Sequence, residues 1–154
     1  MKFRMLSDEE LKVFEEDLKH FLIANGIDGS EWEKINKNDP DKAVDLVGIF
    51  SDAVLQKVYE KVRFLEFRSA QSCFVFKLRQ DKIELIAIQR NGQVDLSTPE
   101  SIHDALTNRL AELQFFRSEK GYNLNREAEI HKMITDGCVP SHEAFWMQLE
   151  KALE

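Results

Sequence analysis

The chain has 154 residues, of which 43% are hydrophobic and 32% charged, and a formal net charge of −7. That length is typical of one domain, and the 6 Gly and 3 Pro residues are too few for a disordered or low-complexity chain. The first residues reach Asp8 before any apolar run, and no stretch approaches the roughly 18 apolar residues of a membrane span. We therefore expect a single cytoplasmic domain over residues 1–154, without membrane association.

The N-terminal third is predicted to be helical. Ser7 and Glu10 have the spacing of a capping box, and apolar residues then recur at helical intervals until the Asn25-Gly26 pair. This pattern predicts a helix from about Asp8 to Ala24.

Two more helices are expected before residue 62. Ser30 and Glu33 repeat the capping-box spacing and predict a short helix. Asp39 followed by Pro40 supplies a cap and a first helical residue for a longer one. We expect this longer helix to be mostly buried, because apolar residues surround much of it: Ala43, Leu46, Val47, Ile49, Phe50, Ala53, Val54 and Val58.

From about Arg63 the hydrophobic period changes from 3.6 to 2. Runs over 63–69, 72–79 and 82–90 predict three antiparallel strands, and Val94–Leu96 is a candidate for a fourth. The third run is apolar on both sides, which favours a central position. In the second run, we expect the side that bears Phe74, Phe76 and Leu78 to meet the helices.

The remaining chain again has helical spacing. Thr98-Pro99, or Ser97 with Glu100, predicts a helix ending near Phe116, and Gly137 closes a second helix over 126–136. Pro140-Ser141 opens a last helix. The expected fold is therefore α+β, with a three- or four-stranded antiparallel meander over about 62–96 packed against N-terminal and C-terminal helices.

No pattern of residues indicates catalysis or cofactor binding. The cysteines, Cys73 and Cys138, have no partner that would activate a thiol, and burial in a strand should raise the pKa of Cys73. Zinc binding by His131, Cys138 and His142 is not supported by any known ligand spacing. Glycine-rich phosphate loops are also absent. We expect no catalytic, metal or cofactor-binding residues.

The charge is unevenly distributed along the chain. Residues 56–90 carry a net charge of +4, whereas the segments on both sides are acidic. Cations interleaved with phenylalanines on strands can bind single-stranded RNA, so RNA or ribosome association is one functional alternative. The alternative, purely structural interpretation is that these cations neutralise acidic groups within the fold. The candidate nucleic-acid surface is Arg63, Arg68, Lys77, Arg79, Lys82 and Arg90.

The leading hypothesis is a non-enzymatic protein that binds another protein, or a cellular assembly, through its helical surfaces. Trp32, Phe116 and Trp146 are the candidate anchors, since large aromatic residues dominate binding energy at interfaces. Core packing is the competing role for each of them. A second alternative, an enzyme with an unfamiliar site, predicts a deep pocket lined by groups with perturbed pKa values. The sequence leaves homo-oligomerisation open.

Three segments carry a family resemblance: MKFRMLSDEEL at the start, LQKVYEKVRFLEFRS in the middle and GCVPSHEAFW near the end. Together they resemble a family of small bacterial proteins classed as a domain of unknown function. The resemblance covers nearly the whole chain. It implies a single cytoplasmic domain and carries no activity or site residues with it.

Overall fold

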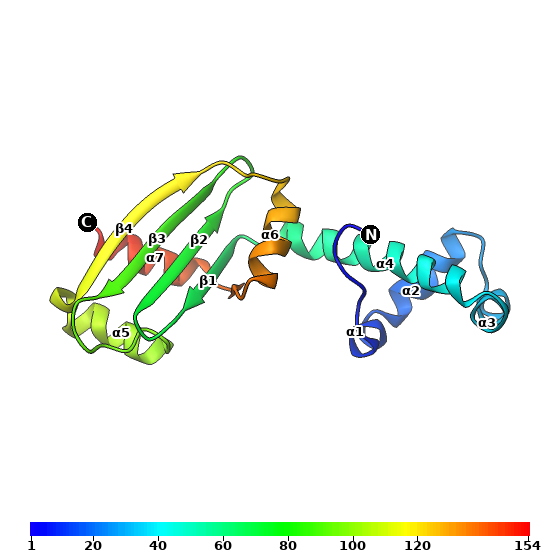
Figure 1. Ribbon diagram of the computed structural model, residues 1–154, viewed down its shortest axis with the longest axis horizontal. Coiled ribbons are helices and arrows are strands. Elements are labelled where there is room, and N and C mark those ends of the chain that lie inside the picture. The colour runs from blue at the N-terminus through cyan, green and yellow to red at the C-terminus, as the bar shows by residue number, and fades with distance from the viewer. The chain divides into compact units, whose positions relative to one another are not determined.

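The computed structural model describes residues 1–154, and the chain divides into two compact units, residues 1–60 and 61–154 (Figure 1). The first unit is helical, and the second contains all the strands. This arrangement is α+β, as predicted. The expectation of one domain spanning the whole chain stays a prediction.

Four helices make up the first unit: α1 Asp8–Val13, α2 Glu15–Ala24, α3 Gly29–Asn38 and α4 Pro40–Lys61. The Ser7 hydroxyl accepts a hydrogen bond from the Glu10 amide, and the Glu10 carboxylate accepts one from the Ser7 amide, so the capping box is confirmed. The predicted continuous helix over 8–24 is wrong. Phe14 leaves helical geometry, with φ −99° and ψ 22°, and separates α1 from α2.

The cap of α3 also differs from expectation. Asp28, rather than Ser30, accepts the hydrogen bond from the Glu31 amide at 2.8 Å, because the helix begins at Gly29 and Ser30 already lies in its first turn. The Ser30 hydroxyl donates to the same Asp28 side chain. Helix α3 therefore begins before Ser30, the cap residue that the sequence favoured.

The apolar core of the first unit forms against one side of α4. Phe50, Leu55 and Tyr59 are buried there, and the Phe21 ring lies 5.5 Å from the Phe50 ring. The buried Ser51 hydroxyl accepts a hydrogen bond from the Leu6 amide at 3.1 Å, which attaches the N-terminal segment to α4. The prediction that α4 is mostly buried is wrong in part, because Val44, Ile49 and Val58 are exposed.

The second unit contains a five-stranded antiparallel sheet in the order β4-β3-β2-β1-β5. The meander of β1 Phe64–Arg68, β2 Ser72–Leu78 and β3 Ile83–Arg90 is as predicted, and β3 is an interior strand between β2 and β4. The fourth strand was misplaced. It is β4 Leu113–Lys120, where the sequence predicted the end of a helix, and Val94–Leu96 forms no strand. The short β5 Val139–Pro140 completes the sheet.

Three helices and a short 3-10 turn accompany the sheet. Thr98 caps α5 Pro99–Asn108, and a 3-10 turn at Leu110–Glu112 leads into β4. Asn125 caps α6 Arg126–Thr135, which Gly137 follows with a φ of +115°. His142, rather than Ser141, caps α7 Glu143–Ala152.

The covered face of the sheet packs against α5 and α7. Its central side chains, Cys73, Val75 and Ile86, join Ile102 of α5 and Trp146 of α7 in one core. In Figure 1, α7 runs behind the strands. The prediction that Phe74 and Phe76 meet these helices is therefore wrong, since successive strand residues point to opposite faces.

The other face, which we call the open face, has apolar side chains from four strands. Register places Phe67, Phe74, Ala87 and Phe116 in one cross-strand row, and Phe76 and Leu85 in the next. The helix α6 lies near one end of this face, where Leu65, Leu78 and Ile83 are buried. At the β1 edge, the ring of Phe67 packs against Gly137. The open face is defined by Phe67, Phe74, Phe76, Leu85, Ala87 and Phe116.

Candidate functional site

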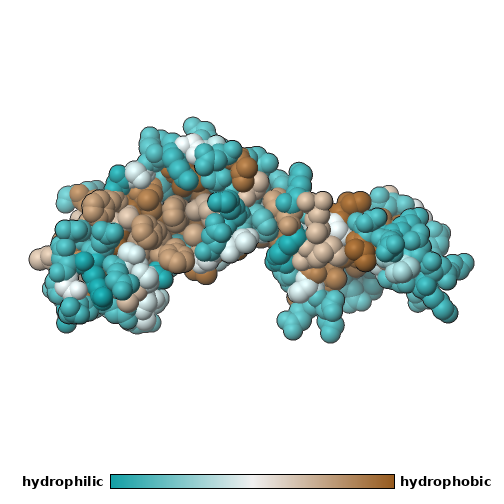
Figure 2. All heavy atoms as spheres, in the orientation of Figure 1, coloured by the Kyte–Doolittle hydropathy of each residue, from teal (hydrophilic) through white to brown (hydrophobic).

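The open face is the candidate binding surface. Figure 2 shows apolar side chains gathered over its strands, in a polar surround. Phe116 is 52% exposed and Phe67 is 40% exposed, whereas Phe74, Phe76 and Leu85 are half-buried. Isolated apolar residues are ordinary at protein surfaces, but contiguous groups of them mark interaction sites. Four phenylalanines on β1, β2 and β4, joined by the apolar residues of β3, form such a group.

The helix α6 limits this surface at one end. The guanidinium of Arg126, 8% exposed, donates to the Leu78 carbonyl at 3.1 Å, the Arg79 carbonyl at 3.2 Å and also the Val62 carbonyl. These carbonyls lie where β1 begins and β2 ends, so one side chain binds α6 to both strands. The Tyr122 hydroxyl donates to the same Arg79 carbonyl at 2.5 Å.

Sequence reasoning considered the strand phenylalanines only as stacking groups of an RNA surface and named none of Phe67, Phe74 and Phe76 as a protein-binding anchor. Phe74 and Phe76 were expected in the core, because the sheet is apolar on both sides and alternation alone does not show which side the helices cover. Cys73 and Val75 alternate with them, and these smaller side chains are the ones in contact with the helices. The signal available in the sequence was that two apolar rows are present although the core needs only one. One row of large side chains therefore remains at the surface.

The predicted cations do not lie among the aromatic side chains of the open face. Register puts Arg68 and Lys77 on the covered face, where Arg68 lies 5.0 Å over the Phe145 ring and Lys77 6.0 Å over the Trp146 ring. Arg68 also forms an ion pair with Glu66. The aromatic and basic components of an RNA platform are thus on opposite sides of the sheet.

Two further cations have acidic partners. Arg79 bonds to Glu84, and Lys82 lies 3.0 Å from Glu119. Burial opposes ionisation of Glu84, but the hydrogen bond from Arg79 and nearby positive charges outweigh it and lower the pKa of this carboxyl. The sixth predicted cation, Arg90, donates to the Val94 carbonyl at 3.4 Å. These contacts agree with charge neutralisation within the fold.

Three of the predicted cations do meet at one place. Arg63, Lys77 and Arg79 line a pocket of about 460 Å³ together with Glu143 of α7. This basic pocket is the part of the predicted nucleic-acid surface that the structure brings together. Glu143 offsets part of its positive charge.

The three predicted anchors have different environments. Trp146 is 1% exposed and lies in the core of the second unit, where its side chain is enclosed. Trp32 is half-buried on α3. Phe116 lies on β4 in the open face and is the anchor that shares a surface with other aromatic side chains.

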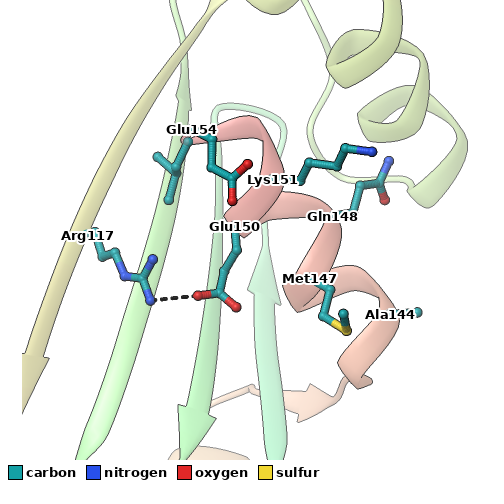
Figure 3. A pocket seen from close by; sticks show the side chains of 8 residues that line it. Arg117, Ala144, Met147, Gln148, Glu150, Lys151 and Glu154 are labelled. Carbon is teal, nitrogen blue, oxygen red and sulfur yellow. Dashed lines mark hydrogen bonds and ion pairs between the residues drawn. The ribbon is translucent and has the colours of Figure 1, made fainter.

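A second hollow lies on the covered side, beside α7. It has a volume of about 720 Å³, and Figure 3 shows Arg117 of β4 reaching Glu150 of α7 across it at 2.9 Å. Arg117 also lies 5.8 Å over the Trp146 ring. This ion pair holds α7 against the edge strand β4, so its role is structural.

Histidines line a smaller pocket of about 220 Å³ next to Arg68. The Nδ1 atom of His142 accepts the Phe145 amide at 3.3 Å and so caps α7, and the Nδ1 atom of His103 lies 3.1 Å from the Gln148 amide nitrogen. Both rings are therefore held by structural contacts.

The thiols are unsuited to nucleophilic chemistry. Burial raises the pKa of Cys73 to about 12, as the sequence predicted in direction, and burial also raises the pKa of the half-buried Cys138. No group of three or more His, Cys, Asp or Glu side chains is arranged to hold a metal ion, so His131, Cys138 and His142 form no such group. None of the helices combines the length and apolar character required to cross a membrane.

Comparison with known proteins identifies one relationship. The model of a family of unknown function, DUF6495, matches residues 1–154. Neither the curated proteins nor the solved structures include a match to this chain.

Proposed function

This chain belongs to the DUF6495 family, and we propose that it is a non-enzymatic protein-interaction protein whose open face binds a partner protein. The observation that carries the proposal is the group of four phenylalanines on one face of β1, β2 and β4, two of them at least 40% exposed. The proposed surface is the sheet, rather than the helices that the sequence favoured. A cytoplasmic location is part of the proposal.

The chemistry of the open face favours a partner that presents apolar side chains. Its central rows contain phenylalanine, leucine and alanine, and polar residues such as Gln89 and Gln114 lie toward one end. An apolar centre with polar margins is the usual composition of a protein interface. Rigid aromatic side chains lose little conformational entropy on binding, so they are effective anchors.

RNA binding is the second candidate, and one observation favours it. Arg63, Lys77 and Arg79 line one pocket, which could receive a phosphate group. The proposal is weaker because Arg79 is paired with Glu84 and because Glu143 also lines the pocket. The aromatic open face also lacks these cations.

Affinity capture with matched baits tests the proposed protein interaction. The baits are the wild type, the double variant Phe67→Ser and Phe116→Ser, and the control Leu124→Ser, whose side chain is 49% exposed outside the open face. We expect a partner that binds the wild type and the control, is lost with the double variant, and binds again as a purified protein. Identical capture by all three baits would contradict the proposal.

Fluorescence anisotropy with labelled single-stranded RNA tests the second candidate. RNA binding through the basic pocket should weaken steeply with salt and should decrease with the double variant Arg63→Ala and Lys77→Ala. Absence of binding at about 50 mM salt would remove RNA as a candidate. Binding that survives this double variant would place the RNA elsewhere.

A further inference from the structure

The outer strand β4 has an unpaired edge. It ends the strand order of the sheet, pairs with β3 on one side only, and six of its eight residues are exposed. An exposed edge strand presents free backbone donors and acceptors that can pair with another strand. The opposite edge is much shorter, since β5 has two residues.

The backbone groups available at this edge can be identified. The Asn91 amide donates to the Glu112 carbonyl at 2.7 Å, so these two residues form a hydrogen-bonded pair at the end of the β3–β4 ladder. Because antiparallel pairs alternate between bonded and non-bonded, Gln114, Phe116 and Ser118 direct their backbone groups toward β3. The amides and carbonyls of Phe115, Arg117 and Glu119 therefore point outward along the free edge.

Antiparallel pairing of β4 with a second copy is self-complementary when Phe116 is at the two-fold axis. Phe116 then faces Phe116 of the second copy, and Phe115 faces Arg117 of the second copy. Glu112 faces Lys120 of the second copy, and the symmetry makes this opposite-charge pair twice. Cross-strand pairs of these kinds stabilise sheets.

Two alternative symmetric registers, about Arg117 and about Ser118, are less complementary. A two-fold axis at Arg117 places two guanidinium groups directly opposite each other, which is repulsive. An axis at Ser118 retains only the last residues of the strand in pairing and sets Phe116 against Lys120. The register about Phe116 pairs the whole outward-pointing set and opposes no like charges.

We propose that the protein forms a homodimer by antiparallel pairing of two β4 strands about Phe116. The two five-stranded sheets join into one ten-stranded sheet. A two-fold axis perpendicular to the sheet keeps both open faces on the same side, so the two groups of phenylalanines become one continuous apolar surface. The dimer stands on the free edge of β4 and does not depend on the proposed binding of another protein.

Charge exchange tests the register. Lys120→Glu and Glu112→Lys each replace two attractive pairs in the dimer by repulsive ones, so each should raise the dimer dissociation constant by at least about tenfold. The double variant restores opposite charges and should recover most of the lost affinity. Sedimentation equilibrium measures all four proteins, and circular dichroism verifies that each remains folded.

Disulfide trapping tests the position of the axis in the Cys138→Ser background, where the remaining Cys73 is buried. Residues in a non-bonded antiparallel pair have Cα atoms about 4.5 Å apart, within disulfide range. Phe116→Cys should therefore form a covalent dimer on mild oxidation. Ser118→Cys is the control, since its symmetry mate would lie roughly 14 Å away.

Each result decides for or against the dimer. Rescue by the double charge variant together with crosslinking at 116 supports it. A wild type that stays monomeric at millimolar concentration, unrescued charge variants, or crosslinking at 118 in preference to 116 would overturn it. These outcomes are measured on the purified protein alone, so they report self-association and not capture of another protein, although Phe116 belongs to both surfaces.

Discussion

The two faces of the sheet have similar residues and different environments. On the covered face, Cys73, Val75 and Ile86 contact α5 and α7 and are fully buried. On the open face, Phe74 and Phe76 alternate with Cys73 and Val75 in β2 and are only half-buried. The larger apolar side chains are thus on the side with less cover. For an isolated unit this is unfavourable, because exposed aromatic area gains nothing from the hydrophobic effect.

The difference indicates that helix placement, rather than strand composition, determines which apolar row becomes core. The loop after β3 and the loop after β5 lead into α5 and α7, and both helices supply core residues to one face. The other face has α6 at one end, held by Arg126. The apolar surface that remains between α6 and the far end of the strands is the surface assigned to binding.

The largest expected effect is on the covered face. Replacing Trp146, which is 1% exposed, by alanine removes a large side chain from the core and should lower the free energy of unfolding by about 3–5 kcal/mol. Phe116→Ala on the open face should change it by less than about 1 kcal/mol when the protein is dilute enough to be monomeric. Urea unfolding followed by circular dichroism, with amide exchange of β2 and β3, measures both.

Equal losses of stability from these two variants would break the comparison. That result would mean that Phe116 is covered in solution, either by another part of the chain or by a second copy. Dilution separates these outcomes, because only the second depends on protein concentration.

The next effect concerns the end of the open face beside α6. Arg126→Met keeps the apolar stem of the side chain but removes the donors to three carbonyl groups, at a cost of about 2–3 kcal/mol. Amide exchange should then increase in α6 before it increases in β3. Lys132→Met, at a side chain 67% exposed on the same helix, is the matched control and should have little effect.

The smallest effect is a dependence on pH at the margin of the covered face. The pKa of Glu84 is lowered in the folded protein, so its ionisation contributes stability above its unfolded pKa of about 4.3. That contribution is lost as the pH falls through the lower pKa that Glu84 has in the folded protein. The size is about 1 kcal/mol, because the partner Arg79 is 48% exposed.

Glu84→Gln should therefore lower stability at neutral pH and flatten its decline below about pH 4.3. Glu119→Gln is the control, since this carboxylate is 60% exposed beside Lys82 and should have a smaller effect. Parallel pH profiles for the wild type and Glu84→Gln would show that this carboxyl does not titrate with a lowered pKa.

The sequence predicted the elements with a strong periodic signal. The meander over 63–90 alternates with period 2, and the caps at Ser7, Thr98 and Gly137 have distinctive residue types. The strand β4 was missed because Ile102, Leu106, Leu110 and Leu113 continue a helical spacing by coincidence. The helix ends at Asn108, Arg109 adopts φ −134°, and Leu113 is already a strand residue.

The candidate site was harder to predict than the fold. Phe116 was chosen as an anchor for its size, but Phe67 and Phe74, which share its cross-strand row, come from strands whose facing cannot be read from alternation when both rows are apolar. Trp146 was chosen on the same ground and is core. Which aromatic side chain remains at the surface depends on long-range packing of helices that the local pattern does not encode.

The turn after α6 constrains how Phe67 is presented. Gly137 has a φ of +115°, and a Cβ atom placed there would lie 3.1 Å from Cε2 of the Phe67 ring. The Phe67 ring thus occupies the space that a side chain at position 137 would need. Alanine at 137 would both strain the turn and force the ring to tilt. A single glycine outside the strands thereby determines the shape of the surface that a binding partner would contact at the β1 side of the sheet.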